Sequence, residues 1–283
     1  MSVSSQVVST GKTGTIGRFF PRDWFGLSFR SYVGNEASLP SSFALSEASL
    51  VHAAAIVGHG KAGLDPSETA RVNVHEASRL AEEAASLGFL RFILVSTSHV
   101  YGPLNRHPGE YDQVNPASFY AETKAKAEEA VAATLKGTST RLTVLRVFSV
   151  LGLDDPEGTL SHRMRLLAQG HPGILKFSSD ERDFLSPSQV ARNIETLLTV
   201  PILPSILNVC TGKAVSLEQV GNHMTDALGQ RRDSIEYEKA FSTFPHQRGN
   251  SSLLIALHPG CPQEFKLMGA PSSGEHTPEG SDP

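Results

Sequence analysis

Residues 90–102 read LRFILVSTSHVYG, and residues 120–124 read YAETK. The first stretch is a continuous apolar run that closes on hydroxyl-bearing residues, which is typical of a strand buried on both faces of a parallel sheet. In the second stretch, a spacing of four places Tyr120 and Lys124 side by side on one helix face. The order strand, loop and helix predicts a parallel α/β sheet with polar side chains gathered where its strands end.

The residue types in these two stretches suit hydride transfer at a carbon that bears an alcohol. Such chemistry needs a phenol to move the alcohol proton, an ammonium to acidify that phenol, and a second hydroxyl to hold the oxygen. A positive charge about 4 Å from a phenol, at an effective dielectric constant near 20, is worth roughly 4 kcal/mol. That energy corresponds to a fall of about three units from the usual Tyr pKa of about 10. We therefore expect a lowered Tyr120 pKa, although Tyr-x-x-x-Lys also occurs by chance in many helices.

Strand-like and helix-like segments alternate along most of the chain. Strands are predicted at residues 6–9, 27–33, 48–57, 90–96, 142–150, 174–178, 182–186, 206–210 and 235–239, and helices at 65–87, 119–135, 160–169, 187–198 and 217–228. The predicted fold class is α/β, a doubly wound parallel sheet (Rossmann-like) with a smaller C-terminal substrate-binding lobe. We assign residues 1–152 to the dinucleotide-binding domain, with a strand and helix at about 182–210 returning to it. Residues 153–269 form mainly the lobe, and residues 270–283 are predicted to be a disordered tail.

Composition excludes several classes of protein. The formal net charge is −4 and no long basic run occurs, so nucleic-acid binding is not expected. No apolar stretch approaches the roughly 20 residues that a membrane span needs. The N-terminus lacks the features of a secretion signal, and the two cysteines predict no disulfide framework. We expect a cytoplasmic protein without a metal site.

Residues 10–17 read TGKTGTIG, a pattern of three glycines directly after the first predicted strand. Such glycines allow backbone N–H groups to approach a pyrophosphate, although a tight turn in any α/β protein gives the same pattern. Pro21 follows closely, so the first helix must be very short or end before it. No acidic residue closes the second predicted strand, where Arg30 lies instead. Arg30 favours NADP over NAD as the cofactor, although an exposed surface arginine is an equal alternative.

These landmarks together resemble the extended short-chain dehydrogenase/reductase family, and within it the NAD(P)-dependent epimerase/dehydratase group that acts on nucleotide sugars. The similarity runs in family order from residue 10 to about 215. Its further landmarks are His52–Ala55, Asn73-Val74, Leu145–Ser149, Arg182-Asp183-Phe184 and Asn208–Gly212.

The resemblance implies a role for each matching residue. Tyr120 would be the acid/base, Lys124 would bind the nicotinamide ribose and lower the Tyr120 pKa, and Thr97 would bind the reacting oxygen. The other implied cofactor-binding residues are Gly11, Thr13, Gly14, Thr15, Ile16, Gly17, Arg30, Ala53, Ala54, Ala55 and Asn73. The implied substrate-binding residues are Ser98, His99, Ser149, Arg182 and Arg248. Arg182 would bind a diphosphate, and its alternative is a surface ion pair with Asp180.

Two departures from the family pattern bear on the activity. Dehydratases of this group carry Asp-Glu after the catalytic Thr, whereas this chain has Ser98-His99, so 4,6-dehydration is not expected. Ser149 replaces a common Asn, which weakens the expected substrate contact.

The predicted function is hydride transfer at a sugar carbinol, at C4, of a nucleotide-sugar substrate. An epimerase and an NADPH-dependent ketoreductase fit equally, and a non-catalytic NAD(P)-binding sensor is a third alternative. The helices at about 70–87 and 119–135 suit a homodimer, although packing on the sheet also explains their alanines.

Overall fold

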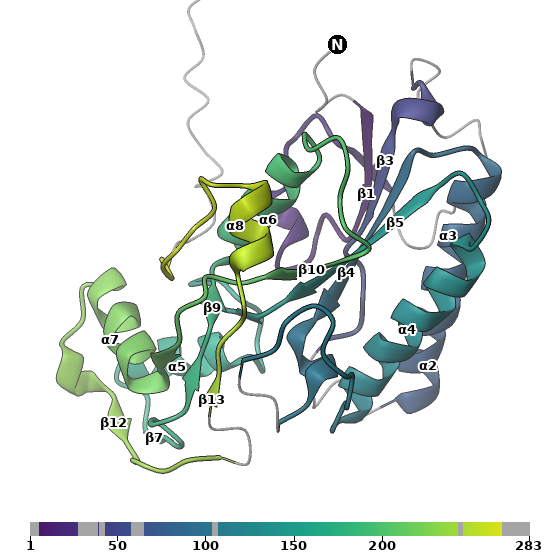
Figure 1. The fold of residues 1–283 in the computed structure, drawn as a ribbon. Helices are drawn as coiled ribbons and strands as arrows, with labels where there is room; N and C mark the ends of the chain where they lie inside the picture. Colours follow the sequence, from purple (N-terminus) through teal and green to yellow (C-terminus); the bar gives the residue numbers. More distant parts are fainter. Residues whose placement is uncertain are drawn as a thin grey trace, which may run out of the picture.

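The computed structural model describes residues 6–27, 39, 43–57, 65–103, 107–242 and 246–267. Its centre is a six-stranded sheet in the order β10-β5-β4-β3-β1-β2 (Figure 1). Every pairing in this sheet is parallel. The strands are β1 (Val7–Thr10), β2 (Phe25–Leu27), β3 (Ser49–His52), β4 (Arg91–Thr97), β5 (Arg141–Val147) and β10 (Ile206–Val209). This arrangement confirms the predicted doubly wound α/β fold class.

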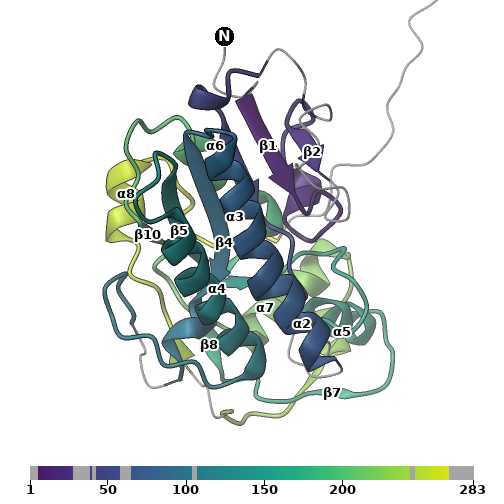
Figure 2. The same ribbon diagram turned by 90° about the vertical axis from the view of Figure 1, so that its right-hand side faces the viewer.

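Helices cover both faces of the sheet, which explains why its strands are continuously apolar. Helices α3 (Glu76–Ser86) and α4 (Phe119–Leu135) lie on one face, and α6 (Pro187–Leu197) and α8 (Ser252–Leu257) lie on the other (Figures 1 and 2). Successive strand residues point to opposite faces. Val7 therefore packs in the core beneath α6, whereas Val8 packs in the core beneath α3 and α4.

The helical segment before β4 has an internal irregularity. It comprises α2 (Pro66–Ala70), a π-helical turn (Arg71–His75) and α3. Asp65 caps its start by accepting a hydrogen bond from the Glu68 backbone N–H at 2.9 Å. The π-helical turn contains Asn73, whose side chain is buried.

Three alanines of α3, one of the two helices predicted to suit a homodimer, are buried within this chain. Ala77, Ala81 and Ala84 of α3 belong to the core beneath the sheet. The outer surface of α3 carries ion pairs instead, with Arg79 bonded to Glu76 and Glu83. Burial therefore accounts for these alanines of α3, whereas Ala132 and Ala133 of α4 are exposed. The homodimer stays a prediction.

A smaller lobe is built from residues that follow β5. Its helices are α5 (Leu160–Ala168) and α7 (Leu217–Ala227), and its short strands are β6 (Ser149–Val150), β7 (Ile174–Leu175), β8 (Glu181–Arg182), β9 (Phe184–Leu185), β11 (Val215–Ser216), β12 (Glu236–Tyr237) and β13 (His246–Gln247). A separate apolar core lies between α5 and α7. Strand β10 and helix α6 lie with the main sheet, but β8 and β9 pair within small sheets of the lobe. The division of the chain into domains stays a prediction.

Several predicted boundaries differ from the structure. The strand predicted at 142–150 is broken at Phe148, because β5 belongs to the main sheet and β6 pairs with β9. The second strand begins two residues earlier than expected, at Phe25. The rest of that predicted strand, including Arg30, lies outside the described residues, as does the predicted tail at 270–283. Strand β13 and helix α8 were not predicted.

Within the described part of the chain, no helix has the length and apolar character required to cross a membrane.

Candidate active site

A cavity of about 280 Å³ lies where the parallel strands end. Thr97 lies on its wall at the end of β4, and Tyr120 and Lys124 reach it from the first turns of α4. Residues that follow β1, β3 and β5 also line the cavity, namely Thr15, Ile16, Ala53, Ala55 and Ser149. The three residues predicted to be catalytic therefore face one cavity, at the edge of the sheet where α/β proteins bind ligands.

The electrostatics of Tyr120 differ from the sequence-based expectation. Burial raises its pKa to about 12, and a hydrogen bond with Thr97 opposes this change only in part. The expectation of a lowered pKa is wrong for this structure, because the lost hydration of the phenolate outweighs the stabilising hydrogen bond with Thr97. Tyr120 is consequently a protonated phenol at neutral pH.

Lys124 is buried, and its ammonium Nζ donates a hydrogen bond to the Val95 carbonyl at 2.8 Å. Burial lowers the Lys124 pKa to about 8, while the charge of Glu128 opposes the fall. Glu128 lies one helical turn beyond Lys124, so Tyr120, Lys124 and Glu128 form a series at intervals of four.

Glu128 was not among the residues predicted from the sequence to belong to the site. Its carboxylate forms a buried ion pair with Arg146 of β5, at 2.7 Å from Arg146 Nη2, and accepts a hydrogen bond from Ser96 at 2.5 Å. The Arg146 guanidinium also lies over the Tyr101 ring, 4.7 Å from its centroid. This network joins β4, β5 and α4, and Ser96 within it lines the cavity. The four-residue interval after Lys124 was the signal available in the sequence.

The glycine loop after β1 makes a compact turn. Gly11 has a φ of +77°, and a Cβ atom at Gly17 would lie 2.0 Å from the Gly11 carbonyl oxygen. Only a three-residue 3₁₀ helix follows (Gly17–Phe19), which confirms that the first helix ends before Pro21. Thr15 and Ile16 of this loop line the cavity, and so do Ala53 and Ala55 after β3. Gly11, Thr13, Gly14 and Gly17 shape the turn and are not on the cavity wall.

The segment after β3 is held by buried polar contacts. Thr10 Oγ1 lies 2.8 Å from His52 Nδ1 and accepts a hydrogen bond from the Ala54 backbone N–H at 3.3 Å. Burial lowers the His52 pKa to about 3, so its imidazole is neutral. Asn73 bonds both the N–H and the carbonyl of Ile56, at 2.8 and 3.0 Å. Asn73 and Ala54 thus position the backbone beside the cavity without lining it.

The residues predicted to bind substrate are divided between several places. His99 and Ser149 line the cavity. Ser98 is fully buried and bonds Gln247 at 3.0 Å. Arg182 forms an ion pair with Asp180 at 3.3 Å, which was the alternative interpretation of this residue. Arg248 lines a different, polar cavity together with Lys213.

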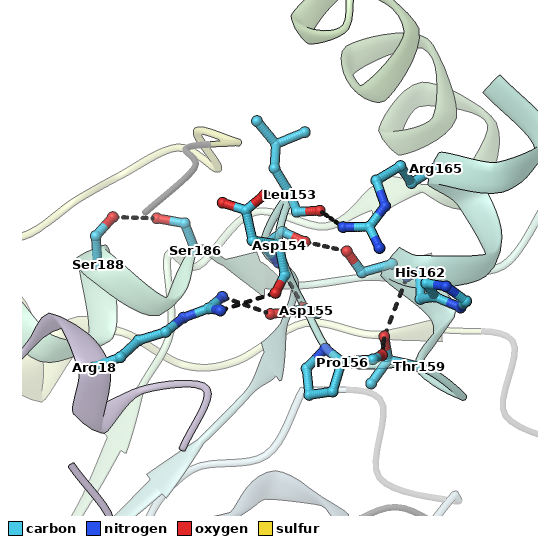
Figure 3. A network of polar contacts seen from close by, with 12 residues as sticks. Arg18, Leu153, Asp154, Asp155, Pro156, Thr159, His162, Arg165, Ser186 and Ser188 are labelled. Carbon is cyan, nitrogen blue, oxygen red and sulfur yellow. Dashed lines mark hydrogen bonds and ion pairs between the residues drawn. The ribbon is translucent and has the colours of Figure 1, made fainter. Parts of the chain in front are cut away.

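The lobe contributes cavity residues that the sequence analysis missed: Asp155, Thr159, Leu160 and Ser161. Asp155 is held by Arg18 of the 3₁₀ helix, at 3.3 Å from Arg18 Nη2 (Figure 3). Its second oxygen accepts a hydrogen bond from the Gly152 N–H at 2.8 Å. Burial raises the Asp155 pKa, and these contacts oppose the rise. The segment between β6 and α5 had no pattern that marked it as part of a site.

Among the residues that the structure describes, no group of three or more His, Cys, Asp or Glu side chains is arranged to hold a metal ion.

Curated proteins similar to this chain include a dTDP-glucose 4,6-dehydratase of Streptomyces griseus. It is 28% identical over 191 residues, which cover 66% of this chain and 58% of the relative. An uncharacterized UDP-glucose epimerase of Bacillus subtilis is 25% identical over 162 residues, covering 56% of this chain and 51% of the relative. The chain thus spans about half the length of the curated relatives it matches.

Solved structures share the fold over nearly the whole chain. MoeE5 in complex with UDP-glucuronic acid and NAD has a TM-score of 0.70 at 24% identity, covering 89% of this chain and 92% of that one. A UDP-N-acetylglucosamine 4-epimerase from Methanobrevibacter ruminantium has a TM-score of 0.75 at 19% identity, covering 92% and 94%. At identities of 24% and 19%, this structural similarity shows a shared fold and nothing further.

The family model described as "NAD dependent epimerase/dehydratase family" matches residues 41–210, a segment that begins after the glycine loop. Because the matched segment covers more than half of the 283 residues, this protein belongs to the NAD-dependent epimerase/dehydratase family.

Proposed function

We propose that this protein transfers a hydride at a carbinol carbon, at C4, of a nucleotide-linked hexose, and acts as an epimerase. The observation that carries the proposal is the common cavity of Thr97, Tyr120 and Lys124, which also contains glycine-loop residues. The family membership supports the same chemistry, and an epimerase is among the curated relatives.

NAD(P), when bound, supplies the acceptor and donor of the hydride. Thr15, Ile16, Ala53 and Ala55 would hold it, because they line the cavity between the glycine loop and β3. Either NAD or NADP satisfies this arrangement, and we retain NADP as the slightly favoured cofactor because of Arg30. The work of the remaining residues is to hold the sugar and to move one proton.

Tyr120 is the proposed acid/base. Its raised pKa keeps the phenol protonated at neutral pH, which is the state that gives a proton to the ketone oxygen in the reductive half of epimerisation. In the oxidative half, the phenolate form of Tyr120 would take the alcohol proton as the hydride leaves. Thr97 would donate a hydrogen bond to the same oxygen. Lys124, with a pKa of about 8, carries most of its positive charge at neutral pH and would stabilise the phenolate that forms.

A second candidate function is a 4-keto-sugar nucleotide reductase that uses NADPH. The protonated state of Tyr120 favours this direction of reaction. The three-residue helix after the glycine loop also supports it, because so short a helix gives a pyrophosphate a weak anchor and would allow the cofactor to exchange.

Dehydration is not proposed, although a 4,6-dehydratase is among the relatives. The position that carries an acid in the dehydratases is Ser98 here, and its hydroxyl is directed to Gln247 inside the protein.

The test is a panel of UDP- and dTDP-linked hexoses and 4-keto-hexoses, assayed with NAD, NADH, NADP and NADPH. An epimerase converts one sugar to its C4 epimer, seen by chromatography, without net change in reduced-nicotinamide absorbance. A reductase oxidises the reduced nicotinamide, so the absorbance falls in proportion to the product formed. Mass spectrometry of any dinucleotide that remains bound after purification identifies the cofactor.

Tyr120→Phe provides the matched control, because it removes one oxygen and leaves the ring. We expect it to lower turnover by about 10²- to 10⁴-fold while cofactor binding is kept. Tight cofactor binding by the wild-type protein with no turnover of any sugar would instead support the non-catalytic sensor.

A further inference from the structure

Asp155 is the only charged side chain that the lobe contributes to the cavity wall, as far as the described residues show. Its side chain is 4% exposed and comes from the segment between β6 and α5. Thr159 and Ser161, which follow Asp155 on the wall, use their hydroxyl groups within the protein. Thr159 Oγ1 donates to the Pro156 carbonyl at 2.7 Å, and Ser161 Oγ donates to the Gly152 carbonyl.

Two donors hold the Asp155 carboxylate in place. They are the Arg18 guanidinium on one oxygen and the Gly152 backbone N–H on the other. An ionised carboxylate has about four acceptor positions, so an acceptor position remains for a group inside the cavity, whose wall includes Asp155. A ligand that enters this end of the cavity therefore meets a fixed hydrogen-bond acceptor.

The cation that pairs with Asp155 lies away from the cavity. Arg18 is not on the cavity wall, and its Nη1 donates to the Asp154 carbonyl at 2.8 Å (Figure 3). The ion pair is thus oriented with its negative end toward the ligand. Lys124, the cation on the wall, comes from helix α4 and not from the lobe.

We propose that Asp155 selects the sugar, accepting a hydrogen bond from a hydroxyl of a neutral hexose and rejecting a hexuronic acid. This inference rests on the proposed function, since it assigns the cavity to a sugar. A sugar carboxylate at this position would face a like charge and could supply no proton to the remaining acceptor position. Such a repulsive element is a common source of specificity.

The experiment is isothermal titration calorimetry of the full chain at neutral pH with UDP-glucose and with UDP-glucuronic acid, two ligands that differ only at C6. We expect the wild-type protein to bind UDP-glucose at least about tenfold more tightly, or 1.4 kcal/mol. Asp155→Asn removes the charge and keeps the shape, so it should reduce this preference to within about threefold. Asp154→Asn is the matched control, because it removes the same charge from an exposed neighbour, and it should leave the preference unchanged.

Binding is measured rather than turnover, so that the two proposals can fail separately. Absence of turnover on every sugar counts against the proposed function, whereas a binding preference for the neutral sugar still supports the role of Asp155. Equal binding of both sugars by the wild-type protein, or binding of neither, overturns the inference even if Asp155→Asn does not fold. An unchanged preference in a folded Asp155→Asn variant also overturns it.

Discussion

Replacing Lys124 by Met is expected to stabilise the protein at neutral pH while it removes activity. Lys124 is 3% exposed, and its pKa falls from 10.5 to about 8 because burial disfavours the charged form. A fall of about 2.5 units at 1.36 kcal/mol per unit corresponds to about 3 kcal/mol of unfavourable free energy below pH 8. Met has a similar length and no charge, so the variant does not carry this cost.

The effect has a defined dependence on pH. Below about pH 8, Lys124 is charged in both the folded and the unfolded states, and the full unfavourable free energy of burying its charge applies. Between about pH 8 and 10.5, the unfolded state binds more protons at this site than the folded state, so the free energy of unfolding of the wild-type protein rises with pH. The stability advantage of Lys124→Met should therefore shrink by roughly 2 to 3 kcal/mol between about pH 7 and about pH 10.

The assay is urea unfolding of both proteins at several pH values, followed by circular dichroism. Comparing the two proteins cancels contributions from groups that titrate in both of them. The Lys124 hydrogen bond to the Val95 carbonyl is present only in the wild-type protein, and its weakening as the ammonium loses its proton is part of the titration that the comparison measures. A stability difference that stays constant with pH, or grows as pH rises, would refute the assignment of a buried, titrating ammonium.

Three further predictions concern the residues around the site. Glu128→Gln leaves Arg146 buried without its charge partner and should lower the free energy of unfolding, measured in urea, by about 3 to 5 kcal/mol. The double variant Glu128→Gln/Arg146→Met should regain part of that stability. Gly17→Ala should abolish dinucleotide binding, measured by calorimetry, because its Cβ atom would lie 2.0 Å from a carbonyl oxygen of the same loop; binding equal to wild type would contradict this reading of the loop. On a small, phosphate-free carbonyl substrate, Lys124→Met should cost more kcat/KM than Arg182→Ala, since Lys124 acts on the chemistry; equal losses would refute that division of roles.

The amino-acid sequence by itself determined the sheet and the framework of the site. The buried strand that ends at Thr97, and the four-residue interval from Tyr120 to Lys124, depend only on local periodicity. Pro21 ended the first helix for a similarly local reason, because proline cannot continue a helix. Parallel strands end at one edge of a sheet, so these local patterns were sufficient to bring Thr97, Tyr120 and Lys124 to one cavity.

Only the tertiary structure decided the pKa of Tyr120, the partner of Arg182 and which lobe residues line the cavity. The Tyr120 pKa depends on burial, which spacing along a helix does not reveal, and the structure reverses its expected direction. The partner of Arg182 is Asp180 in this fold, although a diphosphate was the favoured interpretation of the same residue from the sequence. Asp155 reaches the cavity because Arg18, 137 residues away in sequence, holds it there. Contacts over such separations depend on how the lobe packs against the sheet, which local residue patterns do not encode.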